Sequence, residues 1–138
     1  MKIKRGVYWC LLIGWMLVIF FFSSQDGTTS SGLSNSIINL FPVRIEPLII
    51  RKIAHFTEYF ILGILSFNLC LEYTDATKKK MLQIWLFCVL YAISDEWHQG
   101  FVGGRNPAIF DVLIDSLGSL FGVLGVFVIS KRCKHKIN

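Results

Sequence analysis

Residues 94–105 read SDEWHQGFVGGR, and they follow directly on the apolar run from Ile84 to Ile93. Two adjacent carboxylates, an imidazole and an amide therefore lie at the end of what the sequence predicts to be a membrane helix. Ionisable side chains inside a bilayer cost about 2.5 kcal/mol or more each on insertion scales, and they commonly mark functional sites. This stretch is a candidate site if other segments bring partners to the same depth.

The composition is typical of a membrane protein rather than of a soluble domain. Of 138 residues, 54% are apolar and 17% are charged. Several apolar runs approach the roughly 20 residues that a bilayer-crossing helix needs. Although the net charge is +5, the basic residues are distributed as a membrane-orientation signal, so nucleic acid is not expected as a partner. The four cysteines stand singly, without the spacing of a zinc site or a disulfide framework.

We predict an all-α fold, an integral membrane four-helix bundle that forms a single domain over residues 1–138. The spans are expected at about 6–24, 52–71, 81–100 and 111–130. Residues 23–36 have a loop composition. Residues 37–50 are interrupted by Pro42 and Pro47, which favours an interfacial segment between the first two spans.

The basic residues predict the orientation of these four spans. The N-terminus carries three, the 72–80 loop three and the C-terminal tail four, whereas the other face has only Arg44, Arg51, Lys52 and Arg105. By the positive-inside rule, both termini are expected to be cytoplasmic, and loops 23–52 and 100–107 are expected to face outward.

Helix rise places the polar residues of all four spans at one depth. With 1.5 Å per residue, a helix that starts near Lys80 reaches the outer leaflet at the acidic stretch of residues 95–99. Five of the nine acidic residues and two of the three histidines fall in this layer. Because isolated charges there are costly, we expect them to face one another across a shared cavity.

Helical spacing supports this convergence. Side chains that share or adjoin a face are Lys52, His55, Glu58 and Tyr59 on the second span, Asp95, His98 and Gln99 on the third, and Asp111 and Asp115 on the fourth. The Gly118-x3-Gly122 pattern further predicts the close approach of a neighbouring helix.

The chain resembles VanZ-like membrane proteins in four blocks that cover nearly its whole length. They are residues 22–25 (FSSQ), residues 51–63 (RKIAHFTEYFILG), residues 91–105, and the Asp111-x3-Asp115-x-x-Gly118 pattern. The second and third blocks together are specific. One departure is Gly104 before Arg105, where proline is common in the family.

The resemblance implies a multi-pass protein of the bacterial plasma membrane with a role in the cell envelope. The family is named after an accessory resistance protein that lowers susceptibility to teicoplanin, a lipid-tailed glycopeptide. Antibiotic resistance is therefore a family association here, and resistance conferred by this chain is not implied.

The first functional hypothesis is an enzyme that acts on a lipid-linked or amphiphilic envelope substrate from the outer side. The partners would be membrane lipids and a lipid-linked envelope intermediate or a lipoglycopeptide. Carboxylates and an imidazole together can move protons, which makes Glu58, Asp95, Glu96 and His98 the catalytic candidates. Substrate-binding candidates, with cations for an anionic head group, are Ser24, Gln25, Arg51, Lys52, His55, Tyr59, Gln99, Arg105, Asp111 and Asp115.

Four alternatives stay open, of which the last is less favoured. A divalent metal ion could be the cofactor, held by His55, Glu58, Glu96 and His98 with Asp111 or Asp115. The cavity could instead capture an acyl-tailed anionic ligand without catalysis, with Phe56, Trp97 and Phe101 along the acyl path. Finally, the charges could form only a structural ion-pair network, although desolvation makes such networks a weak source of stability. A proton-linked transporter is less favoured, because four helices in one copy leave little room for alternating access. The sequence leaves the oligomeric state open.

Overall fold

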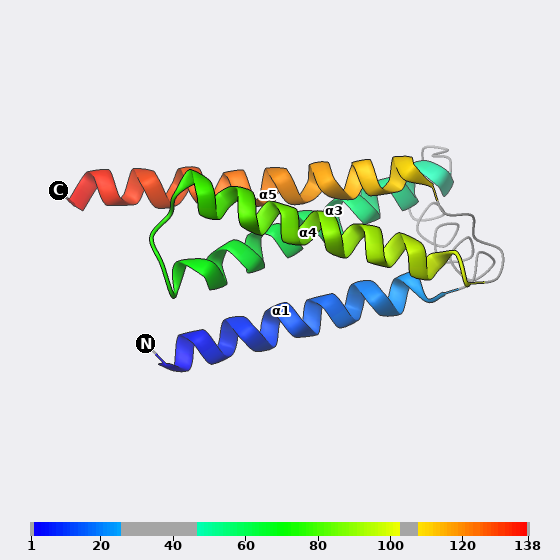
Figure 1. The fold of residues 1–138 in the computed structure, drawn as a ribbon, viewed down its shortest axis with the longest axis horizontal. Helices are drawn as coiled ribbons and strands as arrows, with labels where there is room; N and C mark the ends of the chain where they lie inside the picture. The colour runs from blue at the N-terminus through cyan, green and yellow to red at the C-terminus, as the bar shows by residue number, and fades with distance from the viewer. Residues whose placement is uncertain (1, 26–46, 103–107, 138) are drawn as a thin grey trace, which may run out of the picture.

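A computed structural model describes residues 2–25, 47–102 and 108–137. Within these residues the chain forms four helices, which are α1 (Lys2–Ser23), α3 (Pro47–Leu71), α4 (Lys78–Gln99) and α5 (Ile109–Ile137). Figure 1 shows them side by side as a bundle, with the two ends of the chain at the same end of the molecule. The predicted all-α bundle is thus confirmed. Most of the predicted interfacial segment, as far as residue 46, lies outside the described residues.

Three of the four helices are long and apolar enough to cross a membrane. They are Ile3–Ser23 of α1, Ile49–Leu71 of α3 and Ile109–Cys133 of α5. α4 is 22 residues long, but lysines occupy its first turn and the acidic stretch its last two turns. Its apolar part is therefore shorter than the roughly 20 residues that a span needs. The span expected at residues 81–100 stays a prediction.

Local chemistry explains where the helices begin. α3 starts at Pro47, a residue whose fixed φ and missing N–H suit the first helical position. At the start of α4, the side chain of Thr77 accepts a hydrogen bond of 3.2 Å from the Lys80 N–H, which is a helix N-cap. α5 has Asp111 in its first turn, where a negative charge is favourable.

α3 and α5 cross with their backbones in contact. A Cβ atom added at Gly63 of α3 would lie 2.5 Å from the Ser119 carbonyl oxygen of α5. Added Cβ atoms at Gly118 and Gly122 of α5 would likewise collide with the backbone carbonyls of Phe56 and Phe60. The close approach predicted from Gly118-x3-Gly122 is confirmed, and α3 supplies a third glycine to the same crossing.

α1 is attached to the bundle through side-chain hydrogen bonds. The Trp15 indole donates to the Glu58 carbonyl oxygen at 2.9 Å, and the Tyr91 hydroxyl donates to the Met16 carbonyl oxygen at 2.8 Å. Near the N-terminus, the Arg5 guanidinium donates to the Glu72 carbonyl oxygen at 2.8 Å.

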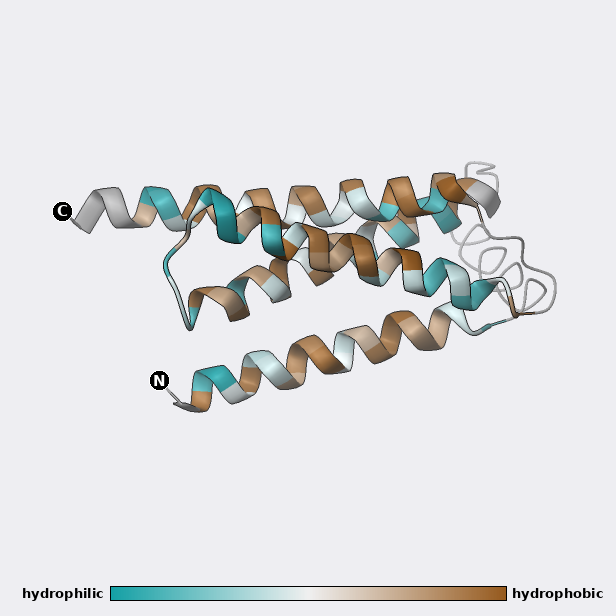
Figure 2. Ribbon diagram, in the orientation of Figure 1, coloured by the Kyte–Doolittle hydropathy of each residue, from teal (hydrophilic) through white to brown (hydrophobic). Residues whose placement is uncertain are grey.

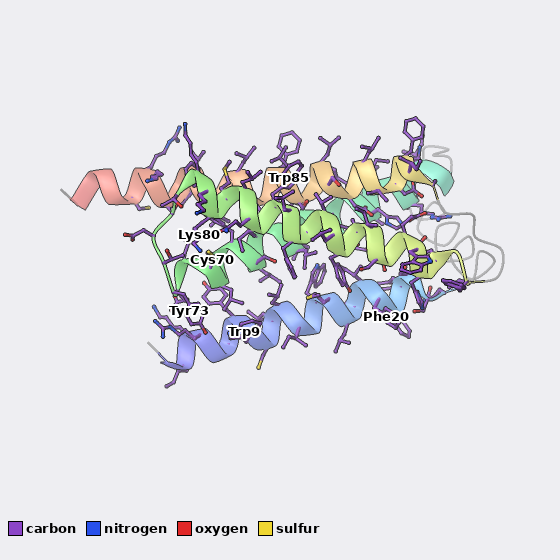
Figure 3. All side chains as sticks on the ribbon, in the orientation of Figure 1. Trp9, Phe20, Cys70, Tyr73, Lys80 and Trp85 are labelled. Atoms are coloured by element: carbon purple, nitrogen blue, oxygen red, sulfur yellow. The ribbon has the colours of Figure 1, made fainter. Side chains whose placement is uncertain are left out.

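A second contact joins the same end of α1 to the α3–α4 connection. The Trp9 indole donates to the Tyr73 hydroxyl at 3.0 Å, and Figure 3 shows both residues at the end that holds the chain termini. These bonds link α1 to its neighbours through side chains, whereas α3 and α5 meet backbone to backbone at the glycine crossing.

Polar residues gather at the end of the bundle opposite the termini. Figure 2 shows hydrophilic segments at the ends of α3, α4 and α5 beside the connections drawn in grey, and apolar segments along the middle. The apolar core between them contains Leu12, Ile19, Tyr59, Leu62, Leu69, Cys88 and Ala92. We call this region the polar end, and among its described residues are the predicted site residues His55, Asp95, Glu96, Gln99 and Asp115.

Candidate functional site

A histidine and an aspartate face each other between α3 and α5. His55 Nδ1 lies 3.5 Å from Asp115 Oδ1, and the aspartate is only 1% exposed. The glycine crossing one turn deeper explains this pairing, because it brings the two helices close enough for short side chains to meet. The contact is electrostatic rather than a well-formed hydrogen bond, so each atom retains hydrogen-bonding capacity.

One turn nearer the start of α3 and of α5, the same two helices form a second pair. Arg51 Nη2 lies 3.9 Å from Asp111 Oδ2, with both side chains partly exposed. The i to i+4 spacing from Arg51 to His55 matches that from Asp111 to Asp115, so the two pairs are stacked along the interface. Lys52 is half-buried on the adjoining face of α3.

α4 contributes a buried carboxylate and amide. The Gln99 amide donates to Asp95 Oδ2 at 3.4 Å, as the i to i+4 spacing predicts. Asp95 also lies within electrostatic range of His55, and the Ser23 hydroxyl of α1 lies beside its carboxylate. All four helices thus contribute side chains to the polar end.

Glu96 connects α4 to the start of α5. Its Oε1 accepts a hydrogen bond of 2.6 Å from the Ala108 N–H, immediately before α5 begins. The residue is 5% exposed, and its second oxygen, Oε2, is buried without a hydrogen-bond partner in the described part of the chain. One carboxylate oxygen therefore has a structural role, and the other faces the interior of the site.

His98 lies at the edge of the site, against α1. The Phe20 ring is 4.6 Å from the His98 ring, and Figure 3 shows Phe20 near the end of α1, beside the last turns of α4. His98 Nδ1 is buried and has no hydrogen-bond partner among the described residues. The imidazole therefore has an apolar wall on one side.

Unpartnered polar atoms concentrate at the polar end. Nine buried side-chain nitrogen or oxygen atoms lack a hydrogen bond within the described ranges, and all except Ser66 Oγ belong to this region. They are Ser23 Oγ, Arg51 Nε, His55 Nδ1, Tyr59 OH, Asp95 Oδ1, Glu96 Oε2, His98 Nδ1 and Asp115 Oδ1. Buried polar atoms in proteins are nearly always hydrogen-bonded, so such a group indicates a place where a ligand or water binds.

Some predicted site residues lie at the margin of this cluster. Ser24 is exposed, and its hydroxyl donates to the Phe20 carbonyl oxygen at 2.6 Å. Gln25 is half-buried, two residues beyond the end of α1. Glu58 lies within electrostatic range of His55. Arg105 lies outside the described residues.

Of the three aromatic residues expected along an acyl path, Phe56 is partly buried, whereas Trp97 and Phe101 are exposed. Phe56 stacks near Phe60 and Phe121, with ring centroids 6.4 and 6.1 Å away. Trp97 and Phe101 are 71% and 79% exposed. A groove with an apolar lining lies between α1 and α4.

Metal-ion ligands are not brought together in the part of the chain that the structure describes. Residues 2–25, 47–102 and 108–137 contain no group of three or more His, Cys, Asp or Glu side chains arranged to hold an ion. His55 is paired with Asp115, while Glu96 is bonded to Ala108. The divalent ion considered from the sequence gains no support from this geometry.

Two parts of the site were not specified by the sequence. The first is Ser23, because an α1 that is apolar on all sides gives no signal for which of two adjacent serines turns inward. The second is the bond from Ala108 to Glu96, which depends on the path of the chain between α4 and α5. The other pairs follow from helical spacing once the neighbouring helices are known.

Comparison with known proteins identifies the family to which the chain belongs. No curated protein and no solved structure matches the chain. A family model described as VanZ/LLP1 matches residues 8–130, which is most of the chain and includes every residue of the polar end. With its membrane-length apolar helices, the chain is a membrane protein that belongs to the VanZ/LLP1 family.

Proposed function

We propose that the polar end binds the head group of a lipid-linked or amphiphilic envelope substrate and transfers protons to or from it. The observation that carries this proposal is the His55–Asp115 pair, buried among polar atoms that have no partner in the described chain. A polar ligand or water would satisfy such atoms, and the surrounding apolar helices favour a ligand that resides in a membrane.

The contacts of each residue indicate which role we propose for it, either proton transfer or binding of the head group. Because Nδ1 of His55 faces Asp115, its Nε2 is the nitrogen left for proton exchange with a substrate. Asp95, Glu96 and His98 each keep an unpartnered buried atom and serve as further proton donors or acceptors, together with Glu58. Arg51, Lys52 and Arg105 supply positive charge for an anionic head group.

The site is proposed to lie in the outer leaflet of a bacterial plasma membrane. Support comes from the opposite end of the bundle, where Lys4, Arg5, the lysines of the α4 N-terminus and Lys131 lie. Positive residues are retained on the cytoplasmic side. The polar end would then face the compartment in which envelope precursors are exposed.

Reconstituted protein provides the test. Wild-type chain in phosphatidylglycerol and cardiolipin vesicles is incubated with a radiolabelled total lipid extract of bacterial membranes, and products are separated by thin-layer chromatography. We expect one lipid species to be converted by the wild type and by Thr57→Ala, an exposed site on the same helix, but not by His55→Gln. Conversion by His55→Gln at the wild-type rate would refute the proton-transfer role.

A non-catalytic binding role is the second candidate. It is favoured by the Glu96–Ala108 bond and the Arg51–Asp111 pair, which engage acidic groups in holding helix ends. In that case the wild type retains one lipid from the extract and yields no product. A role in teicoplanin resistance is compatible with either candidate function. It would be supported if a Gram-positive host became less susceptible to teicoplanin when it expresses the wild type, but not when it expresses His55→Gln.

A further inference from the structure

An apolar groove runs along the outside of the bundle between α1 and α4. Its volume is about 420 Å³, and it is lined by Ile13, Met16, Leu17, Phe20 and Tyr91. The α1 residues recur at intervals of three and four, so they form one face of that helix, and Tyr91 stands opposite them. The Tyr91 hydroxyl is turned away from the groove surface, because it donates to the Met16 carbonyl oxygen.

The position of the groove determines what can fill it. α1 qualifies as a membrane-spanning helix, and Leu17 is 63% exposed on its surface. At that depth the surrounding medium is lipid hydrocarbon, and an apolar cavity is not a favourable place for water. The chemistry of the lining therefore selects a hydrocarbon chain.

The groove is continuous with the polar end along both of its walls. On α1, Phe20 contacts the His98 ring at 4.6 Å, and Ser23 follows one turn later beside Asp95. On α4, Asp95 follows Tyr91 at i+4, on the same face of the helix. A chain lying in the groove would therefore end where the unpartnered polar atoms begin.

We propose that the groove binds the hydrocarbon tail of the same amphiphile whose head group occupies the polar end. This inference rests on the proposed function and deepens it, because it specifies a ligand with a long tail joined directly to a polar head. The ligand reaches the site sideways from the outer leaflet, between α1 and α4. Near this entrance, the Trp15 indole links α1 to α3 and the Tyr91 hydroxyl links α4 to α1.

The test compares two tryptophan substitutions on opposite faces of α1. Leu17→Trp fills the groove, whereas Leu11→Trp adds the same bulk at an exposed residue, 49% accessible, outside it. The probe is phosphatidylglycerol with a diazirine on one acyl chain, in phosphatidylglycerol vesicles, and adducts are located by mass spectrometry. We expect adducts at the groove residues to exceed those at Leu11 severalfold, and to fall in Leu17→Trp but not in Leu11→Trp.

Turnover of the labelled lipid extract separates the two proposals. If Leu17→Trp loses both the groove adducts and turnover, the tail site serves the reaction. If turnover is unchanged in Leu17→Trp, or the adducts are equally frequent on both faces of α1, only bulk lipid contacts the groove and the inference is overturned while the proposed function stands. If the wild type shows no turnover but Leu17→Trp still loses the groove adducts, the catalytic proposal fails and the tail site stands.

Discussion

Asp115 is deeply buried beside an imidazole, with the carboxylates of Asp95 and Asp111 within electrostatic range. It is less exposed than Asp95 or Glu96, and it faces His55 across the α3–α5 interface. A carboxylate in such a place is costly without a partner, because the interior solvates charge poorly. The pair therefore holds the imidazole in one orientation, which is what proton transfer to a bound head group requires.

The His55–Asp115 contact can be measured by a double-mutant cycle. Asp115→Asn and His55→Gln each leave a buried group without its partner, so each should lower the free energy of unfolding by about 1–3 kcal/mol. The double variant should cost less than the sum of the two single variants, as judged from unfolding in detergent micelles. Strict additivity would show that the two side chains do not interact.

Glu96 allows its structural and chemical roles to be separated. Glu96→Gln keeps an oxygen that can accept the Ala108 N–H, whereas Glu96→Ala removes it. We expect the glutamine variant to unfold like the wild type and to lose turnover of the labelled lipid extract. The alanine variant should also be less stable, by about 1 kcal/mol or more.

Ser94→Ala is the matched control for Glu96, because Ser94 is exposed on the same helix and bonds only to its own turn. It should match the wild type in both assays. Full turnover by Glu96→Gln would leave this residue with the structural role alone.

The side-chain contacts were predictable to the extent that they lie on one helix. The bond from Gln99 to Asp95 follows directly from i to i+4 spacing. Contacts between helices required the bundle itself, because spacing gives the face of a residue but not its neighbour. Thus His55 and Asp115 were both expected in the layer, but their pairing was not.

Among the helices, α3 and α5 pack most closely at their glycine crossing. Three glycines at their crossing leave no room for side chains, and both charged pairs of the polar end span the same interface. The geometry of the pairs therefore depends on the distance between these two backbones. Overpacking this crossing should separate the pairs as well as the helices.

Gly122→Ala tests that dependence. Its Cβ would collide with the Phe60 carbonyl oxygen, so we expect a loss of about 1–3 kcal/mol in unfolding free energy, as for overpacked cores. Gly125→Ala is the control on the same helix, because nothing lies within 4 Å of its added Cβ. Equal stability of the two variants in micelles would contradict the close crossing.

The helix boundaries show where sequence reasoning reached its limit. The predicted ends of the first two spans, residues 24 and 71, agree closely with α1 and α3, because polar runs follow them. α3 begins earlier than expected, at Pro47, since proline is accommodated in a first turn. α5 continues through the basic tail to Ile137, because lysines and arginines are good helix formers.

For the molecule as a whole, the orientation in the membrane is a prediction that labelling can check. In a variant that keeps only Cys133, which is exposed on α5, a membrane-impermeant maleimide should react only after the cells are permeabilised. A second variant lacks the four native cysteines and carries Phe101→Cys at the opposite end of the bundle. This variant should react with the maleimide in intact cells. Labelling in the reverse order would place the polar end in the cytoplasm.

The unpartnered atoms of the polar end also offer a way to find the natural ligand. Each buried group that lacks a hydrogen bond weakens the fold by about 1–3 kcal/mol. A compound that satisfies several of them at once should raise the melting temperature, because binding to the native state adds to its stability. Screening envelope lipids by heat resistance could therefore rank candidate ligands before any reaction is known.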